Sequence, residues 1–169
     1  MQAITYRLWQ VRQQLGFVAP LDAEERREVA RWLPPSAYAL FTGMSPADQR
    51  HSLRVCLGLQ ARGCSEPEML AAALLHDVGK AQGRVPFWTR PLIVVGKRVA
   101  PRLLQRVAIY PHEGLPAWRR ALGNAWWHAE IGADMAAAAG LPERAVLYIR
   151  THHQPRGPAA VLHQVDEAS

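Results

Sequence analysis

The sequence predicts an all-α protein built as a single domain. The alternation of branched and polar residues that marks exposed β-strands is nearly missing, whereas helix start signals recur along the chain. With 169 residues, of which 49% are hydrophobic, the chain is long enough to bury one well-packed core and too apolar for disorder to be expected. Internal repeats and low-complexity segments, which would indicate another architecture, are not found in the sequence.

The N-terminal region, residues 1–44, is predicted to form two amphipathic helices ahead of the core. They extend over about Thr5 to Phe17 and Asp22 to Leu33, where apolar residues recur at helical spacing. Asp22 is placed to cap the start of the second helix. Pro34 and Pro35 are expected to end it.

A strong start signal precedes the first candidate functional residue. Ser45, followed by Pro46 and Asp48, predicts a helix start, so that His51 lies about two turns into a helix that continues past Leu57. Asp48 lies one turn before His51 and has two interpretations, as a group that reaches a metal and as part of the cap. The capping role is the more economical one.

The next helix ends at an adjacent histidine and aspartate. Ser65 with Glu68 predicts a capping box before the helix MLAAALLHD. Gly79 offers a stop immediately after His76 and Asp77. The pair is therefore expected at a helix C-terminal end, facing a cavity.

Three further helices are predicted in the C-terminal third. Helix is expected from Ala125 to Gly140, with His128 in its first turns. Pro142 is expected in the first turn of a helix that carries AVLYIRTHH. A last short helix holds Asp166.

The stretch from residue 83 to residue 123 predicts an inserted helical segment. Repeated prolines break any long helix, yet PLIVVGKRVAPRLLQRV combines apolar and basic residues. A lid over the site and a basic amphipathic element on a membrane surface are both compatible with this pattern. We favour the lid, because such dense apolar residues usually pack on their own domain and the insertion begins directly after HDVGK.

The charge balance favours an anionic partner. Lys and Arg number 20 against 14 Asp and Glu, a formal net charge of +6. A small anionic substrate suits this balance. Specific nucleic-acid binding is not expected, because the arginines are dispersed and do not form a run with interleaved aromatic residues.

The cysteines and the apolar runs bear on localisation. Cys56 and Cys64 are predicted at the end of one helix and in its following turn, where a disulfide would serve little purpose, and there is no Cys-x-x-Cys pair for zinc. MQAITYRLWQ does not resemble a secretory signal, and no apolar run approaches the length of a membrane span. A cytoplasmic protein, soluble or at most peripheral, is the expectation.

The most informative motif is LAAALLHDVGK, which sets His76 and Asp77 side by side at the end of an apolar helix. A buried imidazole beside a carboxylate needs a partner, and a divalent cation is a good one. Metal-competent residues occur on both sides of the motif along the chain: His51, His128, His152, His153 and Asp166. Their joint order predicts a metal site, although each single histidine taken alone is more often an ordinary surface or core residue.

The order of these residues resembles the HD-domain superfamily of metal-dependent phosphohydrolases, whose pattern is a lone His, then His-Asp, then a distant Asp. His51, His76, Asp77 and Asp166 match it one by one. The histidines in WWHAEIGADM and IRTHHQPRG look like its two-metal branch, which includes the HD-GYP phosphodiesterases and the diadenosine tetraphosphate hydrolases. The resemblance runs from about residue 45 to residue 166 and is weakest between residues 83 and 124. The GYP tripeptide is absent, so specificity for cyclic-di-GMP is not implied.

The resemblance implies an HD-domain helical bundle with a core of about residues 45–166 and two divalent metal ions. One ion is held by His51, His76, Asp77 and Asp166, and Asp77 bridges to a second ion held by His128 and His152. Iron or manganese is favoured, while zinc, nickel, cobalt and magnesium stay open. Neighbouring helical residues point about 100° apart, so His152 and His153 cannot both be assumed to reach one ion. We expect His152 to bind metal and His153 to contact substrate or to be solvated.

Three cations are candidates for binding the anionic substrate: Lys80, Arg54 and Arg156. Lys80 closes HDVGK and is expected to balance phosphate charge or assist the leaving group, or else to be a cation at a helix C-terminus. Arg156, in HHQPRGP, resembles the corresponding segment of the diadenosine tetraphosphate hydrolases, and Arg54 lies one turn from His51 or is simply solvated. Two histidines, His112 and His163, have no place in the series.

The resemblance and the ligand set together predict a phosphohydrolase in which a metal-held hydroxide attacks phosphorus, with Asp77 and Lys80 as catalytic residues. Nucleotides and dinucleoside polyphosphates are the expected substrates. Two other functions stay open. A mixed-valent diiron oxygenase of the HD type uses the same ligands and requires oxygen, and a regulatory module would bind a nucleotide without turnover.

Overall fold

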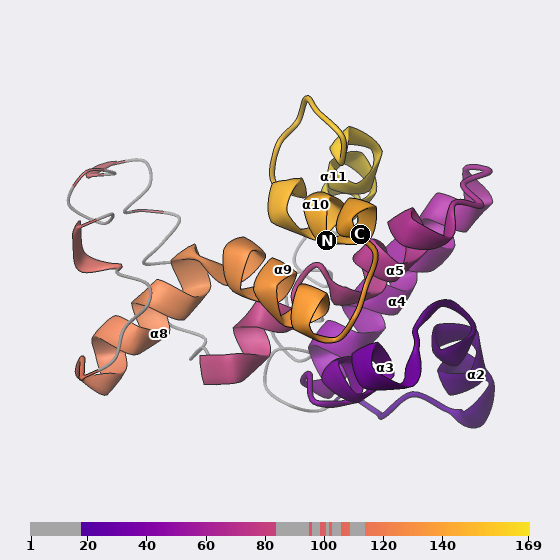
Figure 1. The fold of residues 1–169 in the computed structure, drawn as a ribbon, viewed down its shortest axis with the longest axis horizontal. Coiled ribbons are helices and arrows are strands. Elements are labelled where there is room, and N and C mark those ends of the chain that lie inside the picture. The colour runs from indigo at the N-terminus through magenta and orange to yellow at the C-terminus, as the bar shows by residue number, and fades with distance from the viewer. Residues whose placement is uncertain (1–17, 84–94, 96–98, 101, 103–105, 109–113) are drawn as a thin grey trace, which may run out of the picture.

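The protein is described by a computed structural model, which covers residues 18–83, 95, 99–100, 102, 106–108 and 114–169 (Figure 1). Within these residues every regular element is a helix and none is a strand, so the predicted all-α class is confirmed. The predicted first helix, the larger part of the predicted lid and His112 lie outside the described residues.

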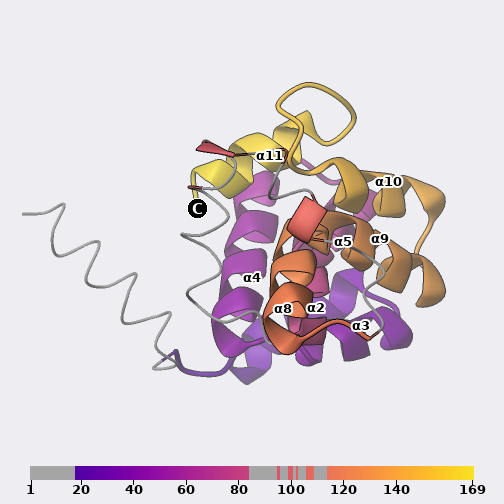
Figure 2. The same cartoon turned by 90° about the vertical axis from the view of Figure 1, so that its left-hand side faces the viewer.

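The helices form one bundle in which the segments that carry candidate ligands pack on one another. Helix α10 packs on α9 and α5, α4 packs on α5, and α9 and α8 both contact the 3₁₀ helix η1. Figure 2 shows α11 lying against α4. The bounds are α2 Ala23–Trp32, α3 Pro35–Thr42, α4 Pro46–Ala61, α5 Pro67–Leu75, η1 Val78–Gly83, α8 Ala117–Trp126, α9 His128–Ala138, α10 Glu143–Thr151 and α11 Ala160–Glu167.

The main core is made by the apolar faces of α2–α5 and α9–α11. Helix α5 is its centre, because every residue from Met69 to Leu75 is buried. A continuous apolar run of this kind is expected for a helix that is covered on all sides. A helix with no free face provides a rigid mount for the residues that follow its end.

Two predicted helix starts are confirmed. Asp22 caps α2 in a capping box, since its carboxylate accepts from the backbone N–H of Glu25 at 2.9 Å and its own N–H donates to the Glu25 carboxylate at 2.8 Å. Ser45 caps α4, and its hydroxyl donates to the Asp48 carboxylate at 2.7 Å. Asp48 therefore belongs to the cap, as predicted.

The start of α5 differs from the prediction, and α3 was not predicted. The expected capping box of Ser65 and Glu68 is wrong, because Glu66 is the N-cap residue, Pro67 takes the first helical position and no side chain caps this end. Pro35 likewise opens α3. In both places the fixed φ of proline suits the first turn of a helix, where its missing N–H costs nothing.

The segment before His128 also differs from the prediction. Ala125 belongs to α8, which ends at Trp126, and α9 begins at His128 itself. The indole of Trp127, at the junction, donates to the carbonyl of Ala108 at 2.8 Å. Ala108 and Leu122 form a small separate apolar cluster, so Ala108, in the described part of the predicted insertion, packs on α8.

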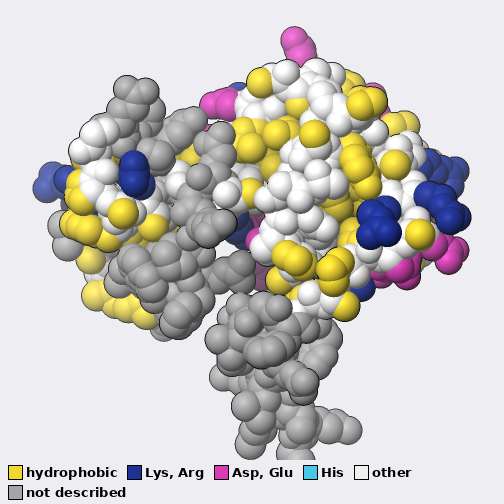
Figure 3. Space-filling model, turned by 90° about the horizontal axis from the view of Figure 1, so that it is seen from below, with side chains coloured by type: hydrophobic (Ala, Val, Ile, Leu, Met, Phe, Trp, Pro, Cys, Tyr) yellow, Lys and Arg dark blue, Asp and Glu magenta, His cyan; other side chains and the backbone are white. Residues whose placement is uncertain are grey.

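The structure bears on the expectations about the cysteines, membrane-spanning helices and the distribution of basic side chains. Cys56 and Cys64 are both free thiols. Among the described helices, none combines the length and the apolar character needed to cross a membrane. On the face shown in Figure 3, Lys and Arg side chains are visible near the left edge and in a larger group at the right.

Candidate metal centre

The six predicted metal ligands come together from α4, α9, α11 and the end of α10, and from the turn that follows α5. His76 and Asp77 directly follow α5, His128 opens α9 and His152 caps the end of α10. The rings form a continuous series, with centroid separations of 5.4 Å for His51 and His76, 5.1 Å for His76 and His152, and 5.4 Å for His152 and His128. Asp166, on α11, joins at the His51 end.

Three of these rings are held in one way. The Nδ1 atoms of His76, His128 and His152 each lie within hydrogen-bond distance of the backbone carbonyl three residues earlier, at 2.8, 3.0 and 2.6 Å. A carbonyl only accepts, so Nδ1 must carry the proton, and Nε2 of the neutral ring is left as a lone pair. Metal-binding histidines are typically oriented by such a bond from the other ring nitrogen.

The Nε2 lone pairs of His76 and His152 are buried and lack protein partners. His76 and His152 are 0% exposed, and neither Nε2 atom has a hydrogen-bond partner. A buried polar atom left unsatisfied costs about 1–3 kcal/mol, and here two such atoms lie in adjacent rings. A bound cation would satisfy both, so the donor set fits a metal.

The two carboxylates lie at spacings suited to metal ligands. Asp166 Oδ1 lies 2.8 Å from His51 Nε2 and 3.5 Å from His76 Nε2. Asp77 Oδ2 lies 3.7 Å from His76 Nε2, while its Oδ1 lies 3.6 Å from His128 Nε2. Two ligand atoms that are each about 2.1 Å from one ion, at tetrahedral or octahedral angles, lie about 3.0–3.4 Å apart. The His51–Asp166 distance is slightly shorter than this range, and the other three distances are slightly longer. The two oxygens of Asp77 therefore face different histidines, as a bridging carboxylate requires.

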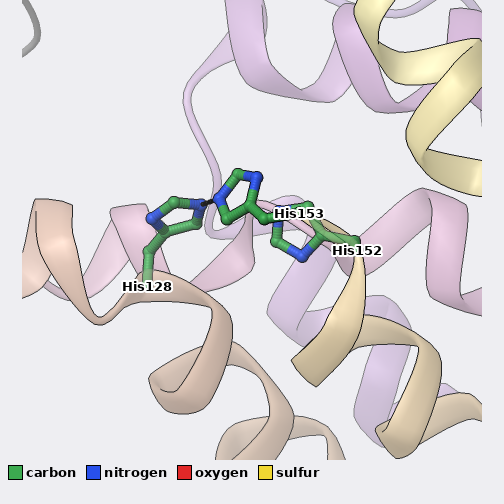
Figure 4. Close-up of side chains that lie close together, drawn as sticks. All are labelled: His128, His152 and His153. Atoms are coloured by element: carbon green, nitrogen blue, oxygen red, sulfur yellow. Dashed lines mark hydrogen bonds between the residues drawn. The ribbon is translucent and has the colours of Figure 1, made fainter. Parts of the chain in front are cut away.

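Two groups of side chains place their ligand atoms within 4.8 Å of one another and can hold a metal ion. The first contains His51, His76 and Asp77. The second contains His128, His152 and His153, whose rings face one another in Figure 4.

His153 lies closer to the centre than expected for a solvated residue. Its Nε2 lies 2.9 Å from Nε2 of His128, although His153 itself is exposed. The ring thus borders both the metal-competent nitrogens and solvent. Its role as a substrate contact stays a prediction.

Burial favours the neutral ring that a metal needs at His128 and His152, whereas nearby carboxylates favour the protonated ring at His76. Burial lowers the pKa of His128 to about 3 and that of His152 to about 2, so both rings are neutral at neutral pH. Burial also lowers the pKa of His76, but the carboxylates of Asp77 and Asp166 outweigh it and raise that pKa overall.

Both carboxylates stay ionised despite their surroundings. Burial raises the pKa of Asp77, yet Lys80, His76 and His128 outweigh it and hold that pKa well below its usual value. For Asp166, the hydrogen bond with His51 and the nearby His76 ring outweigh burial and lower the pKa. Anionic carboxylates beside neutral imidazoles are the forms that bind divalent cations.

Lys80 is the one predicted substrate-binding cation that the described contacts bring to the centre. Its Nζ lies 2.5 Å from Asp77 Oδ2, and its side chain is 24% exposed. Arg54 and Arg156 are exposed, on α4 and in the segment between α10 and α11, and the described contacts of the centre include neither. His163, which has no place in the predicted series, is partly buried on α11.

Gly79 has a role that the sequence reasoning missed. It was expected to stop the helix that carries His76, but α5 already ends at Leu75 and the chain continues as η1. A Cβ added to Gly79 would lie 2.1 Å from the carbonyl oxygen of His128 and 2.8 Å from the N atom of Gly132. Only glycine lets η1 approach the first turn of α9 this closely.

Comparisons with known proteins leave the family open. No family model matches the chain, and no curated protein and no solved structure matches it significantly.

Proposed function

We propose that this chain is a metal-dependent phosphohydrolase of the HD-domain type, acting on a phosphoester or phosphoanhydride bond of a nucleotide or dinucleoside polyphosphate. The observation that carries the proposal is the convergence of bare, buried imidazole nitrogens on two ionised carboxylates. These side chains also occur along the chain in the order lone His, His-Asp, His, His-His and Asp. The order of these residues along the chain and their convergence in the fold are independent observations, because residues 51 and 166 meet only through folding.

The ligands we assign are the six predicted residues, with Asp77 shared between two groups. His76 lies on the Oδ2 side of Asp77 and His128 lies on its Oδ1 side. Asp166 lies next to His76 and His51. A divalent cation held by these residues would lower the pKa of a coordinated water and neutralise charge on phosphoryl oxygens. The carbonyl bonds hold the imidazoles of His76, His128 and His152 in place before substrate binds.

Lys80 is proposed to act on the substrate side of the centre. Its ammonium group contacts Asp77 and also reaches solvent, so it can donate to a phosphoryl or leaving-group oxygen beside the carboxylate. His153 borders the same opening. Arg54 and Arg156 are proposed as outer contacts for further phosphates, which suits the net charge of +6.

The test is hydrolysis by metal-loaded protein. Protein supplied with Mn²⁺ or Fe²⁺ is incubated with bis(p-nitrophenyl) phosphate and with diadenosine tetraphosphate, with and without oxygen and chelator. We expect phosphate-ester cleavage that is lost with chelator, lost in Asp77→Ala and independent of oxygen. Oxygen-dependent turnover would favour the diiron oxygenase, and nucleotide binding without product would favour the regulatory module. Either result overturns the hydrolase proposal.

A further inference from the structure

The partly buried hydroxyl of Tyr148 links α5 to α10 away from the candidate metal centre. Tyr148, on α10, is 4% exposed, and its hydroxyl donates to the Glu66 carboxylate at 2.9 Å. Nε of Arg144 lies 2.7 Å from that hydroxyl and 2.9 Å from the same carboxylate oxygen. The three side chains form a closed network, in which the hydrogen bonds to a charged carboxylate are stronger than neutral ones.

Each helix in this network ends at a candidate metal ligand. Glu66 is the N-cap residue of α5, and His76 is the C-cap residue of the same helix. Tyr148 lies one turn before His152, the C-cap residue of α10. Beyond their packing in the core, α5 and α10 therefore contact one another at two places. One is the network, and the other is the pair of rings of His76 and His152, whose centroids are 5.1 Å apart. Two separated contacts fix both the slide and the rotation of one helix on the other.

The two rings move with their helices. Each is hydrogen-bonded through Nδ1 to a carbonyl of its own helix, His76 to Ala73 and His152 to Ile149. The separation of their Nε2 atoms therefore depends on how α10 sits on α5. Both rings are fully buried, so neither can change rotamer freely to compensate for a helix shift.

We propose that Tyr148, with Glu66 and Arg144, is a positioning residue that sets the spacing between the metal-binding nitrogens of His76 and His152. Burial raises the pKa of Tyr148, so the phenol remains a hydrogen-bond donor at neutral pH. The inference rests on the proposed metal centre. It predicts that a change about one turn from His152, with no contact to metal or substrate, alters metal affinity.

The test compares Co²⁺ binding by the full chain and three variants. Tyr148→Phe keeps the buried ring and removes only the hydroxyl. Glu66→Gln keeps an acceptor oxygen for Tyr148 but removes the charge that Arg144 pairs with. Phe41→Leu is the control, because it loosens the core at α3, which carries no candidate ligand. Each protein is assayed for Co²⁺ affinity by chelator competition, for the visible Co²⁺ absorption spectrum and for thermal stability.

We expect Tyr148→Phe to weaken Co²⁺ binding about tenfold and to shift the absorption spectrum, with Glu66→Gln in between. Phe41→Leu should lower Tm without changing affinity or spectrum. The inference is overturned if Tyr148→Phe binds within about twofold of the wild type with an unchanged spectrum, or if Phe41→Leu weakens binding equally. Should Tyr148→Phe not fold, wild-type affinity and spectrum in Glu66→Gln would overturn it. If the wild type binds no Co²⁺, the metal centre itself is wrong, which is a separate outcome.

Discussion

Replacing Gly79 with alanine should separate η1 from α9 and damage the metal centre at a distance from any ligand side chain. The added Cβ would lie 2.1 Å from the His128 carbonyl oxygen, 2.9 Å from the His128 carbonyl carbon and 2.8 Å from the Gly132 N atom. All three are backbone atoms of the first turns of α9, so no side chain can rotate away. Reaching an ordinary contact of 3.4 Å requires a backbone shift of roughly 1.3 Å.

The expected loss of stability lies at the upper end for an overpacked core. Substitutions that overpack a core typically lower the free energy of unfolding by about 1–3 kcal/mol. For Gly79→Ala we expect a loss of about 3 kcal/mol, because the atoms that the new Cβ meets belong to rigid backbone. For a domain of this size that corresponds to a fall in Tm of about 6–12 °C. The shift moves His128 away from Asp77, whose oxygen now lies 3.6 Å from its Nε2. The variant should therefore also lose metal from the group that contains His128.

Gly132→Ala is the matched control on the opposite side of the same contact. Its added Cβ would meet the Gly79 N atom and the Val78 side chain at 3.3 Å, which needs a shift of only a few tenths of an ångström. Alanine also has the higher helix propensity, by about 1 kcal/mol, so the net change should be small. Thermal unfolding followed by circular dichroism, with metal content by elemental analysis, measures both. A Gly79→Ala protein with Tm within about 2 °C of the wild type and full metal content would refute the reasoning.

Two further substitutions test the metal ligands, and one chemical probe tests the burial of a cysteine. Asp77→Ala should abolish metal binding and activity while the α-helical circular dichroism spectrum persists, because no other carboxylate among the described residues faces both histidine groups. Two retained metals would remove Asp77 from the bridging role. His128→Ala should lose mainly one of two metals, and unchanged stoichiometry would make the site mononuclear or His128 structural. Burial raises the pKa of Cys56 to about 12, so at about pH 8 an alkylating reagent should label Cys64 and spare Cys56 until the protein is denatured. Labelling of Cys56 in the native protein, located by peptide mass spectrometry, would contradict its burial.

The sequence predicted those parts of the fold that depend on local physics. Helix caps act over three or four residues, so Asp22 and Ser45 were identified correctly from their neighbours. Gly140, expected at a helix end, has a φ of 81° that glycine adopts without strain. Proline was harder, because the same residue both ends one helix and begins another. Pro35 and Pro67 each begin a helix, and the first was interpreted only as a terminator.

For the candidate site too, one part could be predicted from the sequence and another part could not. The order of His51, His76, Asp77 and Asp166 predicted that they would meet, because their types share one chemistry, and they lie together in the fold. What supports them was not predictable. Glu66 and Tyr148 are 82 residues apart and carry no motif, and the steric demand at Gly79 arises only when η1 meets α9. Such contacts follow from packing between helices, for which a single sequence contains no local signal.

The central claim is that the converging imidazoles and carboxylates bind metal, and anomalous X-ray diffraction from crystals of protein purified without added metal tests it most directly. Data are collected on both sides of the iron and manganese absorption edges, with crystals of Asp77→Ala as the control. We expect an anomalous peak about 2.0–2.2 Å from His76 Nε2 and from the Asp77 carboxylate, and a further peak near His128 and His152. All of these peaks should be missing in Asp77→Ala. A centre without anomalous density, in protein that elemental analysis also finds free of metal even after incubation with Mn²⁺ or Fe²⁺, would contradict it.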